Sequence, residues 1–169
     1  AANVQANKEA TASVYKVGDT RKVTIDKKDY TVRIANNSNY DCNLESQTAC
    51  GFVVEFADIV ENRNMNSTST NVGGWPATAM RTYANGAFFN NLPEDLRNVI
   101  IDTKVVSGHG STTGETNFTS TDKIYLLSAH EVWEDGTSNQ VSSKDTAYNQ
   151  TRQLDYYKNL GVTISNYSG

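Results

Sequence analysis

The sequence has few of the residues that mark nucleic-acid-binding and membrane-spanning proteins. Its 169 residues hold 15 lysines and arginines against 19 aspartates and glutamates, which gives a net charge of −4. A surface for nucleic acid or anionic lipid would need clustered basic residues instead. No apolar run reaches the roughly 20 residues that a membrane-spanning helix requires. We therefore expect a polar globular chain that binds no nucleic acid and has no membrane span.

The motifs of common catalytic sites are missing too. The chain has no Gly-x-Ser-x-Gly elbow around a nucleophilic serine. The glycine-rich run at 107–114 lacks the ending of a phosphate-binding loop and predicts an exposed loop, with His109 between two glycines. A Cys–His pair would have to join residues far apart in the sequence, Cys42 or Cys50 with His109 or His130. These absences argue against catalysis, and we assign no catalytic residue and no cofactor.

Metal ligands are scarce as well. The two histidines are far apart, so we expect no metal site built on them. Asn62, Asn64 and Asn66 alternate as the first ligands of a calcium loop do, but the glycine and the distal glutamate of that motif are missing. A solvated loop is the simpler interpretation, and calcium is the weaker alternative. Cys42 and Cys50 have no further ligands nearby and predict either a disulfide in an exported protein or two buried thiols.

Residue patterns along the chain predict a mixture of strands and helices. Apolar residues predict strands at 23–25, 30–34, 52–56, 99–106 and 124–127. Helical spacing and proline-led starts predict helices from Trp75 onward, from Pro93 to about Asn98, and from Thr146 to Leu160. Because strands and helices do not alternate regularly, we expect an α+β fold. The small, polar residues 1–13 predict a flexible segment before a single domain at 14–169.

Short local signals mark where these elements begin and end. The tetrad Asp-Lys-Lys-Asp at 26–29 predicts the turn of a hairpin between the first two strands. Gly86 interrupts the helix that starts near Trp75. Ser128 is a candidate cap of a turn that contains Glu131, and Gly161 suits the end of the last helix.

Aromatic residues give the best indication of function. The chain holds two tryptophans and nine tyrosines. Exposed tryptophan and tyrosine rings form platforms for sugar faces or anchors for a protein partner, whereas buried ones only fill the core. We predict ligand contacts at Trp133, Tyr156 and Tyr157, and at the loop residue His109.

Four segments together resemble one known family. They are CGFVVEFADIV at 50–60, NVGGWPATAMRTYANGAFFNNLPEDLRNVII at 71–101, TKVVSGHGSTTGETNFTSTDKIYLLSAHEVW at 103–133 and TRQLDYYKNLGVTISNYSG at 151–169. They resemble an uncharacterised family of bacterial cell-surface domains whose fold is related to C-type lectins and to formylglycine-generating enzymes. The resemblance implies a C-type-lectin-like mixed fold of short antiparallel strands with two or three helices.

The chain departs from this family in two respects. In relatives, the Asn-Tyr-Ser-Gly at 166–169 is usually followed by a Trp-rich segment, and this sequence ends first. That predicts a C-terminally incomplete domain, which would self-associate through an uncovered strand edge or apolar face. The sugar and calcium motifs Glu-Pro-Asn and Trp-Asn-Asp are absent. The resemblance therefore transfers no catalytic or calcium-binding residue.

These observations favour a non-catalytic binding module. We expect a secreted or cell-wall-displayed adhesion module that recognises a glycan or a host or cell-surface protein. A hydrolase acting on surface polymers is one alternative, and it would bring Glu55 or Asp58 together with His109 in a cleft. A ligand-free structural domain of a multidomain surface protein is the other alternative.

Overall fold

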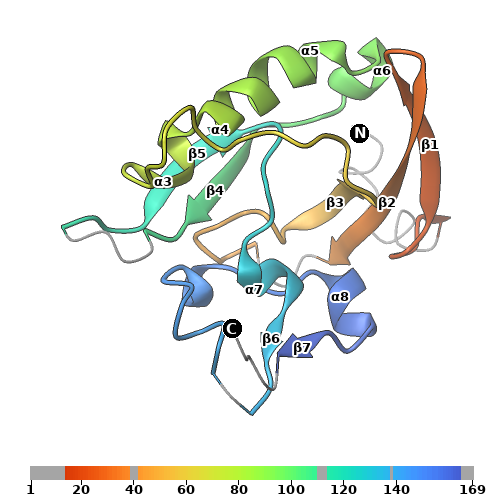
Figure 1. The fold of residues 1–169 in the computed structure, drawn as a ribbon. Coiled ribbons are helices and arrows are strands. Elements are labelled where there is room, and N and C mark those ends of the chain that lie inside the picture. The colour runs from red at the N-terminus through yellow and green to blue at the C-terminus, as the bar shows by residue number, and fades with distance from the viewer. Residues whose placement is uncertain (1–13, 39–41, 110–113, 138, 165–169) are drawn as a thin grey trace.

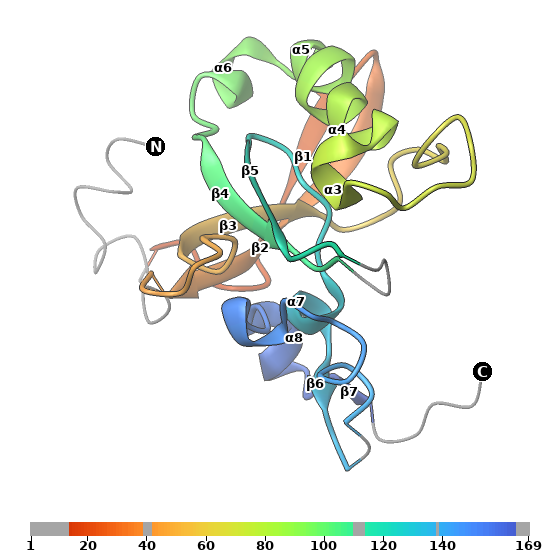
Figure 2. The same ribbon diagram turned by 90° about the vertical axis from the view of Figure 1, so that its left-hand side faces the viewer.

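The computed structural model describes residues 14–38, 42–109, 114–137 and 139–164, and the predicted flexible segment 1–13 lies outside them. Three small sheets and several short helices make up the structure, which confirms the α+β class. A run of short helices between residues 74 and 97 lies along one end of the molecule in both views, and the elements that follow residue 128 form the other end (Figures 1 and 2). None of the helices in the described ranges is long and apolar enough to span a membrane.

The first sheet contains the predicted hairpin. Strands β1 (Thr20–Ile25) and β2 (Lys28–Ser38) pair antiparallel, and Ile25 lies opposite Lys28. Only Asp26 and Lys27 form the turn, and both have positive φ angles, 49° and 66°, as the tightest hairpin turns require. Strand β3 (Gly51–Phe56), the predicted strand at 52–56, pairs with the other edge of β2.

The second sheet joins β4 (Thr103–Ser107) and β5 (Phe118–Asp122), which are antiparallel. Backbone groups of β4 that do not face β5 bond to the loop that precedes β3. The Gln47 N–H donates to the Lys104 carbonyl oxygen at 2.8 Å, and Ser46 Oγ accepts from the Val106 N–H at 3.2 Å. This loop therefore covers the outer edge of β4 and connects the two larger sheets.

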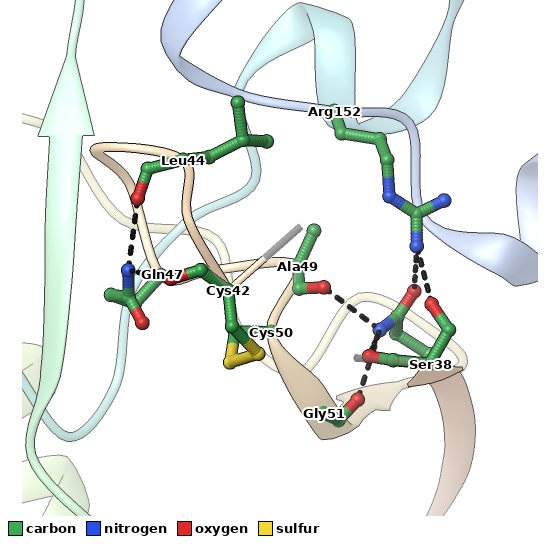
Figure 3. Close-up of a disulfide and its surroundings, with 9 residues drawn as sticks. Ser38, Cys42, Leu44, Gln47, Ala49, Cys50, Gly51 and Arg152 are labelled. Atoms are coloured by element: carbon green, nitrogen blue, oxygen red, sulfur yellow. Dashed lines mark hydrogen bonds between the residues drawn. A yellow bond between two sulfur atoms is a disulfide. The ribbon is translucent and has the colours of Figure 1, made fainter. Parts of the chain in front are cut away.

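The Cys42–Cys50 disulfide closes that loop, as one of the two sequence alternatives predicted, and the Cα atoms of the cysteines are 4.7 Å apart. Figure 3 shows Gln47 and Leu44 inside the loop, where the Gln47 side-chain amide donates to the Leu44 carbonyl oxygen at 2.9 Å. The same amide donates to the Cys42 carbonyl oxygen at 3.1 Å. The loop is thus fixed both covalently and by hydrogen bonds to its own backbone.

The predicted helix after Trp75 is present but interrupted. Helix α3 (Gly74–Ala77) stops at Thr78, whose extended backbone caps α4 (Ala79–Tyr83) and whose Oγ1 accepts from the Arg81 N–H at 3.0 Å. From α4 the chain continues without a break through the π-helical turn η1 (Ala84–Phe88) into α5 (Phe89–Asn91). Gly86 therefore lies in a widened turn and does not end the helix. Helix α6 (Glu94–Arg97) follows Pro93, as predicted.

The C-terminal part differs most from the sequence expectation. The predicted helix at 146–160 is present only at its end, in α8 (Asp155–Asn159). A 3₁₀ turn η2 (Tyr148–Gln150) lies before it, and extended backbone separates the two. Gln153 lies in that extended stretch, where its buried amide donates to the carbonyl oxygens of Val132 and Val162 at 2.9 and 2.7 Å. These hydrogen bonds, together with the buried side chain of Leu154, hold the extended form.

The remaining elements are short. Helix α7 (Ala129–Val132) begins after Ser128, as predicted, and β6 (Glu134–Asp135) pairs parallel with β7 (Thr163–Ile164). The predicted strand at 124–127 is not a strand, and the one at 99–106 is shifted to Thr103–Ser107. Gly161, with φ of 66°, ends α8 as expected. Its N–H and that of Val162 donate to the carbonyl oxygens of Lys158 and Tyr157.

A small core joins the sheet to the C-terminal elements. Ala35 of β2, Ala49 of the disulfide loop and Leu154 before α8 are fully or almost fully buried against one another. Leu127, Tyr156 and Tyr157 pack around them. The core thus unites residues that lie up to about 120 positions apart in the sequence.

Candidate functional site

A groove of about 680 Å³ lies between β4 and the segment that carries α7. The end of β4 forms one wall, residues 126–133 form another, and residues 140–146 close a third side. Ile164 of β7, Met65 and Trp75 complete the lining. The walls are mainly apolar, and the apolar residues among them are Met65, Trp75, Val105, Val106, Leu126, Leu127, Ala129, Trp133, Val141 and Ile164.

Trp133, one of the predicted ligand-contact residues, lines this groove. It follows α7 with extended backbone, and 40% of its surface is exposed. Leu126, on the same side of the groove, is also exposed. The groove therefore combines a solvent-accessible indole ring with accessible apolar surface, an unusual arrangement for side chains that only fill a core.

His109 lies beside the same groove. Its backbone N–H donates to Thr146 Oγ1 at 3.0 Å, and Thr146 and Gly108 both line the groove. A Cβ atom at Gly108 would lie 2.8 Å from Thr146 Oγ1, so glycine allows this close approach of β4 to residues 145–146. Of the predicted ligand-contact residues, Trp133 lines the groove, and His109 lies outside its lining but is bonded to Thr146 at its edge.

Glu131 of α7 contributes a buried carboxyl group to the groove. The residue is only 2% exposed, and its Oε2 accepts a hydrogen bond from the Ser128 N–H at 2.6 Å. Its Oε1 has no hydrogen bond of ordinary distance and angle to any residue that the structure describes, although the Thr48 and Ser128 hydroxyls lie close to the carboxyl group. Burial raises the pKa of this carboxyl group, and the charge of Asp145 adds to the effect, whereas the neighbouring Thr48 and Ser128 hydroxyls act in the opposite direction.

Ser107, the last residue of β4, and Ser128, just before α7, present two more such atoms. Their Oγ atoms are buried and have no hydrogen-bond partner within the described ranges, and both residues line the groove. No sequence pattern marks Ser107 or Glu131 as a site residue. The only signal for Glu131 was the Ser128-x-x-Glu131 spacing of a helix cap, and that signal accounts for one of its two oxygens.

The other two predicted ligand-contact residues, Tyr156 and Tyr157, lie in a different place. They belong to α8 and do not line the groove. The Tyr157 hydroxyl donates to Glu55 Oε2 at 2.8 Å, and the Tyr156 hydroxyl accepts from Arg33 Nη1 at 3.1 Å. The Arg33 guanidinium also stacks on the Tyr156 ring, 3.8 Å from its centre.

An ion pair completes this cluster. Arg33 Nε and Nη2 donate to Glu55 Oε1 at 2.9 and 2.7 Å, and both side chains are largely buried. Burial, together with the hydrogen bond to Glu55, raises the pKa of Tyr157 to about 12. Both carboxylate oxygens of Glu55 are thus occupied in joining β2, β3 and α8. Neither Glu55 nor Asp58, the carboxylates considered for a hydrolase, lines the groove.

The histidine and asparagine side chains considered for catalysis or for metal binding contact other parts of the protein. His130 is buried, and its ring stacks on Tyr148 with 3.7 Å between ring centres. Its Nε2 lies 3.3 Å from Glu134 Oε1. In the loop considered for calcium, Asn66 Oδ1 accepts from the Ala79 N–H at 3.0 Å. Within the described residues, no group of three or more His, Cys, Asp or Glu side chains is arranged to hold a metal ion.

Comparison with known proteins gives one match. The sequence model of a domain family described as a domain of unknown function, DUF6273, matches residues 51–167. The match begins at the first residue of β3, so the β1–β2 hairpin and the disulfide loop precede it. No curated protein and no solved structure matches the chain.

Proposed function

The chain belongs to the DUF6273 family, whose function is unknown, and we propose that it is a non-catalytic module of the bacterial cell surface that binds a glycan in the groove. Its scaffold would be C-type-lectin-like, as the sequence resemblance implies. The observation that carries the proposal is Trp133, which is 40% exposed on the wall of the groove. An indole ring in that position would pack against the C–H face of a sugar ring.

The remaining lining suits the same ligand class. A sugar presents both C–H faces and hydroxyl groups, so its site needs apolar walls with a few polar groups in fixed positions. Leu126 and Ile164 contribute apolar surface, and Ser107 and Glu131 contribute polar atoms. His109, bonded through its backbone to Thr146 at the edge of the groove, adds a candidate contact.

An extracellular location agrees with the covalent structure. The Cys42–Cys50 disulfide persists in oxidising compartments and is rare in cytosolic proteins. The chain also carries a net charge of −4, with few lysines and arginines. A charge of this sign gives no attraction to nucleic acid, and it is compatible with binding an uncharged polymer outside the cell.

A glycan array tests the proposal. We expect the protein to bind at least one class of surface oligosaccharide, and Trp133→Ala to weaken that binding about tenfold or more, because an aromatic anchor in a binding site contributes at least that much. Leu160→Ala is the matched control, since Leu160 is exposed but does not line the groove.

Two results would contradict the proposal. One is glycan binding that Trp133→Ala leaves unchanged, because the ligand would then bind elsewhere. The other is an array with no bound glycan and a pull-down from cell-surface extract that captures a protein through Trp133. That second result would make the groove a protein-binding site.

A further inference from the structure

Three buried oxygen atoms in residues that line the groove lack a partner in the part of the chain that the structure describes. They are Glu131 Oε1 of α7, Ser128 Oγ just before α7, and Ser107 Oγ of β4 on a different wall. A buried polar atom is normally hydrogen-bonded, because the loss of its bond to water is otherwise uncompensated. Such atoms in a ligand-sized groove therefore indicate hydrogen bonds that a ligand would complete.

The cap of α7 does not explain the Glu131 side chain fully. Capping uses Oε2, which accepts from the Ser128 N–H at 2.6 Å. Oε1 takes no part in the cap, and the whole residue is only 2% exposed. We propose that Glu131 Oε1 and Ser107 Oγ form a hydrogen-bonding subsite for an uncharged amide or hydroxyl group of the ligand. For the natural ligand this inference rests on the proposed function.

The surrounding charges favour an uncharged group over an anion. Asp145 also lines the groove, and its oxygens accept from the backbone N–H groups of Ala147 at 3.0 Å and His130 at 3.4 Å. Asp145 therefore acts on the subsite through its negative charge. Lys144, the basic residue of the lining, is exposed to solvent, which weakens its field in the groove. A carboxylate or phosphate on the ligand would be repelled by Asp145.

The subsite can be tested without knowing the natural ligand. Acetamide and acetate have nearly the same shape but differ in charge, so they serve as probes at matched ionic strength in an NMR titration. We expect acetamide to shift the backbone amide signals of Ser107 and Glu131, and acetate to leave them in place. Equal shifts with both probes, or none with acetamide, would overturn the proposal.

Substitutions separate the contributions of the two residues. Glu131→Gln keeps an uncharged polar group and an acceptor for the Ser128 N–H, so we expect acetamide binding within about twofold of the native protein. Glu131→Leu and Ser107→Ala each remove a hydrogen-bonding atom and should weaken binding about three- to tenfold. Ser67→Ala, at an exposed position outside the groove, is the control. Equal binding by the native protein, Glu131→Leu and Ser107→Ala would refute the assignment of these atoms.

The two proposals fail in different ways. If acetamide binds the subsite but no glycan binds the protein, the subsite stands and the glycan ligand is wrong. If glycans bind through Trp133 but acidic glycans bind as well as neutral ones, the glycan module stands and the uncharged subsite is wrong.

Discussion

Asn36 and Glu131 are both buried polar residues, but their hydrogen bonds differ in completeness. The Asn36 amide nitrogen donates to the carbonyl oxygens of Ser38, Ala49 and Gly51, and its Oδ1 accepts from Arg152 Nη2 and the Asp155 N–H. Figure 3 shows Arg152 directed at Ser38 beside the disulfide. Asn36 is thus fully satisfied and structural. Glu131 has one oxygen in a structural bond and one unpaired, which distinguishes a candidate ligand contact from a core residue.

Glu131 should also make stability depend on pH. Its pKa in the folded protein is raised above the ordinary value of 4.5 by burial, so the unfolded chain releases this proton at lower pH than the folded one. The contribution of the neutral carboxyl group is complete below about pH 4.5 and declines as the pH rises toward the raised pKa. Glu131→Gln removes this decline. We therefore expect the free energy of unfolding of the variant, relative to the native protein, to increase between about pH 4 and pH 8.

Urea denaturation of both proteins across that pH range measures this difference. Glu94→Gln is the control, because Glu94 is exposed in α6. Curves of stability against pH that run parallel for the native protein and Glu131→Gln would show that the Glu131 carboxyl group does not titrate differently in the folded state.

A local sequence pattern can single out an exposed candidate residue, but it cannot show which side chains become buried. Trp133 and His109 could be chosen as candidates because an aromatic ring or a glycine-flanked histidine is recognisable by itself, and of the two Trp133 lines the groove. Tyr156 and Tyr157 look the same in the sequence, but Arg33 and Glu55, more than 100 positions earlier, bind their hydroxyl groups. A contact of that separation leaves no local pattern.

At the scale of elements, the disulfide loop has the largest expected effect on stability. The cysteines are 8 positions apart, and closing a loop of that length lowers the entropy of the unfolded chain. We expect the Cys42→Ser and Cys50→Ser double variant to lose about 2–3 kcal/mol of unfolding free energy. Urea denaturation with and without reductant measures it. Reductant should destabilise the native protein and leave the double variant unchanged, and an effect of reductant on both would contradict the prediction.

Elements were predictable where local chemistry and long-range contacts agree. The β1–β2 hairpin has alternating apolar residues and a polar two-residue turn, and both signals are short-range. The predicted helix at 146–160 forms only over Asp155–Asn159, because Gln153 and Leu154 are buried in extended backbone, where Gln153 bonds to Val132 and Val162. Those hydrogen bonds outweigh the helical preference of the segment. No residue near Gln153 in the sequence predicts them.

At the scale of the whole molecule, Leu154 joins parts that are distant in the chain. It is 0% exposed and contacts Ala35 of β2 and Ala49 of the disulfide loop. Leu154→Ala should lower the free energy of unfolding by about 2–5 kcal/mol, since it removes buried methyl groups and leaves a cavity. Thermal or urea unfolding measures the loss.

Leu160→Ala is the matched control for this core substitution. Leu160 is 62% exposed, so the same change there should alter the free energy of unfolding by less than about 0.5 kcal/mol. Equal effects of the two substitutions would mean that the contact of Leu154 with the sheet does not hold the C-terminal elements in place.

The loop that covers the outer edge of β4 links the solubility of the protein to the compartment in which it folds. An uncovered strand edge pairs readily with the same edge of another copy. Ser46 and Gln47 occupy that edge only while the loop keeps its shape, and the Cys42–Cys50 bond helps to keep it. In a reducing cytoplasm the disulfide would not form, and the uncovered edge of β4 would be free to pair with the same edge of another copy. Export before oxidation would keep the copies apart until the disulfide forms and the loop covers that edge.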